Sequence, residues 1–123
     1  MVDNRPAILI AEDQIFIALE AERILSEAFD CAVEICRRDR LTEVLLDKTF
    51  DLIILELSGN RDEDLHYVFL ARQAGGEVAF LTAADDLSDM AEVFPDIPLI
   101  RKPFNDTDVR SFVERLLTRA QAG

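Results

Sequence analysis

Short runs of apolar residues alternate with longer amphipathic stretches along the chain. Three runs are too short for a helix and apolar on both faces, and they predict buried strands over residues 7–11 (AILIA), 52–57 (LIILEL) and 78–82 (VAFLT). Val33 and Ile35 alternate with polar neighbours, which predicts a more exposed edge strand. Residues 97–101 predict a short fifth strand that contains Pro98. We therefore expect five strands.

Between the runs, apolar residues recur at helical spacing of three and four. The pattern predicts a helix over residues 14–29 and a second, short helix around Leu41–Leu45. It predicts a third helix that includes Leu65–Phe69, a fourth that includes Leu87–Phe94, and a last helix along the stripe from Val109 to Ala120. Gly75–Gly76 is expected to end the third helix and Pro95 the fourth. Asn105 is the expected N-cap of the last helix, with Asp108 near its positive end.

Five strands that alternate with five helices predict βαβ units and a mostly parallel sheet covered on both faces. No GxGxxG or GxxxxGK[ST] motif occurs, so neither a dinucleotide fingerprint nor a nucleotide P-loop is present. The α/β doubly wound, flavodoxin-like (βα)5 sandwich with strand order 2-1-3-4-5 fits a chain of 123 residues. We expect one domain over residues 1–123.

Composition narrows the classes of partner. The chain has 13 Lys and Arg against 25 Asp and Glu, a formal net charge of −12, which disfavours nucleic acid and anionic membrane surfaces. The apolar runs are too short to span a membrane or form a signal peptide. Cys31 and Cys36 cannot build a disulfide framework and, five apart on an expected strand, should face opposite sides as reduced thiols. We expect a cytoplasmic protein.

Polar residues follow the expected strands where each ends, at the sheet edge on which doubly wound folds bind ligands. They are the pair Glu12–Asp13 after the first strand, Glu56 after the third, Thr82 after the fourth and Lys102 after the fifth. Each has an ordinary alternative: the acidic pair could favour a helix N-terminus, and Thr82 and Lys102 could be a turn residue and a solvated charge. Glu56 needs a partner, because a carboxylate that closes a buried strand must be paired, metal-bound or protonated. Converging carboxylates point to a hard cation such as Mg²⁺.

With these residues in order, the chain resembles a response-regulator receiver (CheY-like) domain of two-component signalling over essentially its whole length. The resemblance rests on Glu12–Asp13, the LIILEL strand, Thr82 in FLTA, and Lys102-Pro103-Phe104. It implies that the acidic pair holds Mg²⁺ weakly together with Glu56 and the carbonyl of Ser58. It also implies that Thr82 and Lys102 bind phosphoryl oxygens and that Pro103 follows a cis peptide bond.

The chain departs from the family pattern at the residues that carry the chemistry. Glu56 stands where the family has its phospho-acceptor Asp, and Leu99 stands at the position of the aromatic switch residue. The loop Leu57-Ser58-Gly59-Asn60 lacks the usual Pro. Asp51 cannot replace the acceptor, because it opens the strand about 16 Å away.

A glutamate at the acceptor position is expected to phosphorylate slowly or not at all. Its extra methylene moves the carboxylate by about 1.5 Å, and a misplacement of about 1 Å can cost roughly 10²-fold in rate. The same carboxylate could engage Lys102 and Thr82 as an incomplete mimic of a phosphoryl group, since it carries less charge. The leading interpretation is a stand-alone atypical receiver, a pseudo-receiver that is not an enzyme and acts by protein–protein contact.

Three alternatives stay open. The chain could be a conventional Mg²⁺-dependent phosphoacceptor that tolerates Glu56, or an ordinary receiver with an engineered Asp-to-Glu change. A small metal-dependent phosphatase would need its own base and substrate pocket, and the only histidine, His66, lies in an expected helix. Expected partners are a histidine kinase, a phosphotransfer protein or another regulator. A homodimer would use the face formed by the fourth helix, fifth strand and fifth helix.

Overall fold

Five parallel strands form one sheet in the order β2-β1-β3-β4-β5, as the sequence predicts. In the computed structural model they are β1 (Ala7–Ala11), β2 (Ala32–Cys36), β3 (Leu52–Glu56), β4 (Glu77–Thr82) and β5 (Leu99–Arg101). The structure describes residues 5–82, 88–101, 107, 109–111, 113–115 and 118. The central strands β1 and β3 pair in register, with Ile8 beside Leu52 and Ala11 beside Leu55. Their carboxyl ends therefore lie side by side.

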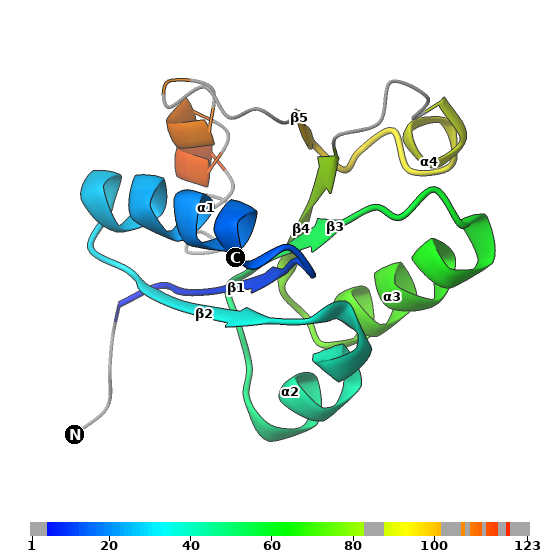
Figure 1. Cartoon of the computed structure of the whole chain (residues 1–123), viewed down its shortest axis with the longest axis horizontal. Coiled ribbons are helices and arrows are strands. Elements are labelled where there is room, and N and C mark those ends of the chain that lie inside the picture. The colour runs from blue at the N-terminus through cyan, green and yellow to red at the C-terminus, as the bar shows by residue number, and fades with distance from the viewer. Residues whose placement is uncertain are drawn as a thin grey trace.

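Helices follow the strands and lie over both faces of the sheet (Figure 1). They are α1 (Ile15–Ala28), the 3-10 turn η1 (Arg38–Arg40), α2 (Leu41–Asp47), α3 (Arg61–Gln73) and α4 (Ser88–Val93). The described residues between 107 and 118 are also helical. None of the helices in the described ranges is both long enough and apolar enough to cross a membrane.

Alternation along the buried strands divides the core into two layers. On one face Ile8, Ile10 and Leu52 pack against α1 and against Val109 and Val113. On the other face the alternate strand residues pack against α2, α3 and α4; they include Leu9, Ile53, Leu55, Val78 and Phe80. The sheet is thus covered on both sides, which explains why β1 and β3 read as continuous apolar runs.

The ends of several elements differ from the sequence prediction. Leu57 lies beyond β3, and β5 begins at Leu99, after Pro98. Proline lacks an N–H, but the carbonyl of Pro98 still accepts a hydrogen bond from the Phe80 N–H at 2.8 Å. The turn η1 was not predicted, and Asn105 lies outside the described residues.

The two cysteines face different layers of the core, as predicted. Cys31 lies just before β2, not on it as predicted, and is buried in the layer below α1. Cys36 is the last residue of β2 and packs at the edge of the other layer. Both are free thiols.

Candidate functional site

Acidic and hydroxyl side chains gather at the carboxyl edge of the sheet. Glu12 follows β1, Glu56 ends β3 and Thr82 ends β4, and these three strands are neighbours. Glu12 and Thr82 are each only 1% exposed, whereas Glu56 is partly buried. The structure therefore brings three of the predicted site positions to one edge. Asp51 lies at the opposite edge, where its Oδ2 accepts a hydrogen bond from the Ala7 N–H at 2.8 Å.

An arginine at this edge was not among the predicted site residues. Arg38 begins η1, with one residue between it and the end of β2, and its side chain is only 6% exposed. Its Nη1 donates to the backbone carbonyl of Glu56 at 3.3 Å and to Oδ1 of Asp64 at 3.2 Å. Its Nη2 donates to Oε1 of Glu63. One guanidinium therefore joins the end of β3 to the first turn of α3.

Arg38 also holds the loop that follows β1. Its backbone N–H donates to Oδ1 of Asp13 at 2.8 Å, and its Nε lies 3.7 Å from Oδ2 of the same carboxylate. Among the described residues, Nε of Arg38 is the buried side-chain nitrogen without a hydrogen bond. The Tyr67 ring lies on the guanidinium, with Cζ 5.2 Å from the ring centroid, in cation–π geometry.

Asp64 organises the loop between β3 and α3. It is 1% exposed, and its Oδ1 accepts hydrogen bonds from the N–H and the hydroxyl of Ser58 at 3.0 and 2.9 Å. Its Oδ2 accepts from the Gly59 N–H at 3.2 Å, and Gly59 has a positive φ of 89° that favours glycine. Asn60 then caps α3 by accepting from the Glu63 N–H at 3.2 Å. The buried carboxylate thus has both an ion pair and hydrogen bonds, as burial requires.

The magnesium ligand set that the sequence suggested is not assembled among the residues the structure describes. No three His, Cys, Asp or Glu side chains of that part of the chain are placed to hold a metal ion. Asp13 accepts a hydrogen bond from the Arg38 N–H. Ser58 contacts Asp64 through its N–H and hydroxyl, not through the carbonyl that was the predicted ligand. Binding in solution stays a prediction.

The acidic edge also shapes the chemistry of Cys36. Burial, together with the nearby negative charges of Glu34, Asp13 and Asp39, raises the pKa of Cys36 to about 11. A thiol with this pKa is protonated at neutral pH and is a poor nucleophile. Cys36 therefore does not supply a reactive group to the site.

The structure places some of the remaining predicted site residues and not others. Leu99 begins β5 and packs, partly buried, against the layer that contains Phe80. Lys102 and Pro103 lie outside the described residues, so their predicted contacts are not placed. His66 lies in α3 beside Tyr67, with ring centroids 5.5 Å apart.

A sequence signal for Arg38 did exist. The pair Arg37–Arg38 follows the second strand, whose carboxyl end shares the edge with β1 and β3. Applying the strand-end rule to that strand would have placed a cation beside the carboxylates. The spacing from Asn60 to Glu63 is likewise a helix-start pattern, which would have placed Asp64 in the first turn of α3.

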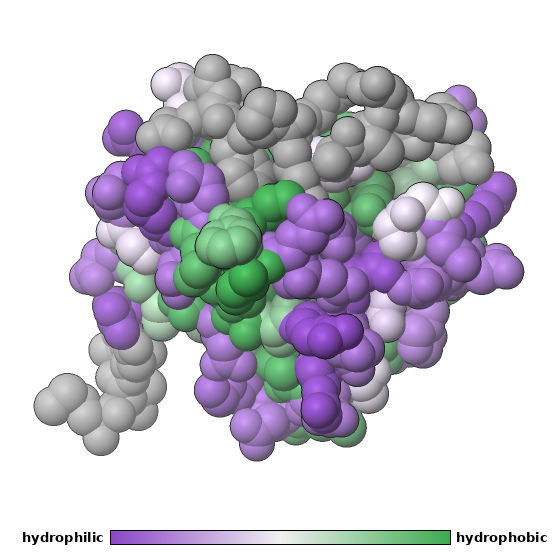
Figure 2. Space-filling model, in the orientation of Figure 1, coloured by the Kyte–Doolittle hydropathy of each residue, from purple (hydrophilic) through white to green (hydrophobic). Residues whose placement is uncertain are grey.

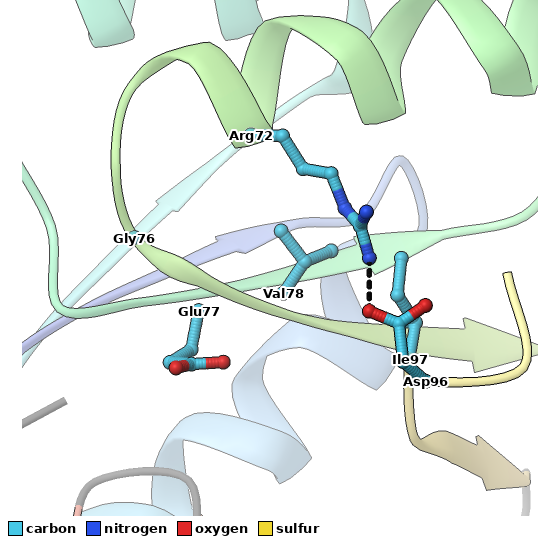
Figure 3. Close-up of a pocket in the computed structure, with 6 residues that line it drawn as sticks. All are labelled: Arg72, Gly76, Glu77, Val78, Asp96 and Ile97. Atoms are coloured by element: carbon cyan, nitrogen blue, oxygen red, sulfur yellow. Dashed lines mark hydrogen bonds and ion pairs between the residues drawn. The ribbon is translucent and has the colours of Figure 1, made fainter. Parts of the chain in front are cut away.

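A pocket of about 190 Å³ lies at the opposite edge of the sheet, near the start of β4 (Figure 3). There Arg72 donates to Asp96 at 2.6 Å and lies 5.1 Å from the centroid of the Phe94 ring. The guanidinium is engaged by its own neighbours, and the pocket is remote from the carboxyl edge. It is therefore not part of the candidate site.

A small apolar patch is exposed on α1. Ile15, Phe16 and Leu19 are 53%, 84% and 45% exposed. Figure 2 shows hydrophobic surface in the middle of the face where α1 begins. Exposed apolar residues that gather in this way are typical of protein contact surfaces.

Solved structures of receiver domains share this fold. A response regulator receiver protein from Burkholderia phymatum is 24% identical with a TM-score of 0.75, covering 93% of this chain and 96% of that one. A receiver protein from Sinorhizobium medicae is 19% identical with a TM-score of 0.80, covering 95% and 98%. The signal receiver domain of an HD domain-containing protein from Pseudomonas fluorescens is 20% identical with a TM-score of 0.83, covering 99% and 93%.

Comparison of sequences alone finds no relative of the chain. No protein-family model matches the chain, and no curated protein sequence matches it significantly. The similarity to receiver domains thus rests on the structure, which shows that the chain has the receiver fold.

Proposed function

We propose that the chain is an atypical receiver domain of two-component signalling that works by binding other proteins, with little or no phosphorylation. The observation that carries the proposal is Glu56 as the last residue of β3, at the edge where Glu12 and Thr82 also lie. A receiver catalyses its own phosphorylation mainly by geometry and charge. A longer side chain at the acceptor position removes the first of these.

Two further features support the same function. Asp13, which a conventional phosphoacceptor would direct to a metal ion, instead accepts a hydrogen bond from the Arg38 N–H. The exposed apolar side chains Phe16 and Ile15 of α1 suit a protein that binds partners such as a histidine kinase, a phosphotransfer protein or another regulator. The predicted homodimer face of α4, β5 and the last helix stays a prediction.

The test is labelling with acetyl phosphate and Mg²⁺, read by intact-protein mass. The unmodified chain is expected to gain no phosphoryl group, because the Glu56 carboxylate is misplaced for in-line attack. Glu56→Asp is expected to gain one group that hydroxylamine removes. Glu56→Gln is the matched control, because an amide cannot form an acyl phosphate and any label that it retains is nonspecific.

The outcomes separate the candidate functions. Labelling of the unmodified chain that is absent from Glu56→Gln would overturn the proposal and establish a conventional phosphoacceptor. Failure of Glu56→Asp to label would extend the proposal, because the loop at Ser58 or the residue Leu99 would then have disabled the site as well. Steady release of inorganic phosphate from a simple phosphate ester would instead indicate a phosphatase.

A further inference from the structure

The guanidinium of Arg38 joins the same segments that a metal ion would join at this edge. On one side it faces the Asp13 carboxylate, in the loop after β1. On the other it binds the Glu56 carbonyl at the end of β3 and the Asp64 carboxylate in α3. A divalent cation in an acidic cluster also holds oxygen atoms from separate loops close to one another.

Arg38 keeps its positive charge and its buried position among the carboxylates of this edge. A guanidinium stays protonated at every pH at which proteins are folded. It lies within ion-pair distance of three carboxylates, those of Asp13, Glu63 and Asp64. Its side chain is only 6% exposed, so the three carboxylates share one positive charge that the protein itself supplies.

We propose that Arg38 is a built-in cation that competes with divalent metal ions for Asp13, so that the carboxyl edge is organised without metal. Arg38 holds Asp13 through the backbone N–H as well as through the charge, and both contacts come from one residue at the start of η1. The Nε of Arg38 makes no hydrogen bond and lies 3.7 Å from Oδ2 of Asp13, so the positive charge is next to the oxygen for which a metal ion would compete. This inference concerns cation binding and is independent of whether Glu56 accepts a phosphoryl group.

The experiment compares Mn²⁺ binding by calorimetry and by water proton relaxation in the unmodified chain and in Arg38→Met. Methionine keeps the unbranched apolar part of the side chain and removes the charge. The unmodified chain is expected to bind Mn²⁺ weakly, and Arg38→Met about tenfold more tightly, the factor that corresponds to losing one modest ion-pair competitor. Adding Asp13→Asn to Arg38→Met is expected to abolish the gain.

Arg37→Met is the matched control. It lies next to Arg38 and removes the same charge, but its side chain is 71% exposed and pairs with Asp39. A gain in Arg38→Met but not in Arg37→Met supports the proposal, whereas an equal gain in both would reduce it to a general charge effect and overturn it. Arg38→Gln, which is neutral but still polar, provides a second variant, and folding of all variants is checked by circular dichroism.

Two other results would overturn the proposal. One is unchanged Mn²⁺ affinity in a folded Arg38→Met or Arg38→Gln. The other is saturable Mn²⁺ binding by the unmodified chain with a Kd below about 0.1 mM, tighter than weak sites of this kind, that is lost in Asp13→Asn. Neither result depends on acetyl phosphate labelling, so failure here is distinct from failure of the proposed function.

Discussion

Replacing Asp64 by alanine is expected to be strongly destabilising. The substitution removes a carboxylate that is 1% exposed and accepts four hydrogen bonds, from Arg38, from the N–H and hydroxyl of Ser58, and from the N–H of Gly59. Removing one partner of a buried ion pair costs about 3–5 kcal/mol, because the other charge stays buried. Arg38 keeps Glu63 and Asp13, so we expect a loss near the lower end, about 3 kcal/mol.

Urea unfolding followed by far-ultraviolet circular dichroism measures this loss. The chain has no Trp and one Tyr, so backbone dichroism is a better probe than fluorescence. With a slope of about 2 kcal/mol per molar urea, a loss of about 3 kcal/mol lowers the midpoint by about 1.5 M. Asp62→Ala is the matched control, since it removes an exposed acid from the same helical turn and should cost less than about 1 kcal/mol.

A double-mutant cycle tests the cause. If Asp64 stabilises the fold chiefly through Arg38, then Arg38→Met with Asp64→Ala should lose less than the sum of the single losses, with a coupling of about 1–3 kcal/mol. Equal effects of Asp64→Ala and Asp62→Ala would refute the reasoning. So would strict additivity in the cycle, which would leave the loop hydrogen bonds as the whole effect.

The remaining predictions concern the thiol of Cys36 and the turn before β4. Because the pKa of Cys36 is raised from 9.0 to about 11, its alkylation by iodoacetamide should be slow at pH 8 and accelerate as the pH approaches 11; fast labelling at pH 8, mapped by peptide mass, would contradict this. The stability that the protonated Cys36 contributes should be complete below pH 9 and lost as the pH rises through about 11, measured as the urea midpoint against pH. Gly76→Ala should destabilise by about 1–3 kcal/mol, because a Cβ there would lie 2.6 Å from the Phe50 carbonyl oxygen. Gly75→Ala should cost only about 1 kcal/mol, because its φ of 90° is strained for alanine but the space is open; a larger loss at Gly75 than at Gly76 would contradict the steric reasoning.

The periodicity of the sequence was sufficient to predict the fold. Buried strands such as β3 need apolar side chains on both faces, and helices such as α1 need a stripe at three- and four-residue spacing, and both patterns are local. The strand order follows from short parallel connections, and the edge position of Glu56 follows from its place at the end of β3. Element ends were less certain, as Leu57 and Pro98 show, because terminal residues depend on hydrogen bonds that periodicity does not encode.

The environment of the site was decided by the tertiary structure. Arg38 meets Asp13 across 25 residues of sequence and Asp64 across 26, so no local pattern joins them. From sequence alone, an arginine that follows a strand could be either a site residue or a charge on the surface. Arg37, the neighbour of Arg38, is a surface charge. Only the packing of β2 beside β1 and of α3 against the same edge buries one of the two guanidinium groups among carboxylates. The sequence by itself determined that Glu12, Asp13 and Glu56 reach the carboxyl edge. The tertiary structure decided that Arg38 joins them and pairs with Asp13, because pairing depends on distances between segments that only the folded sheet brings together.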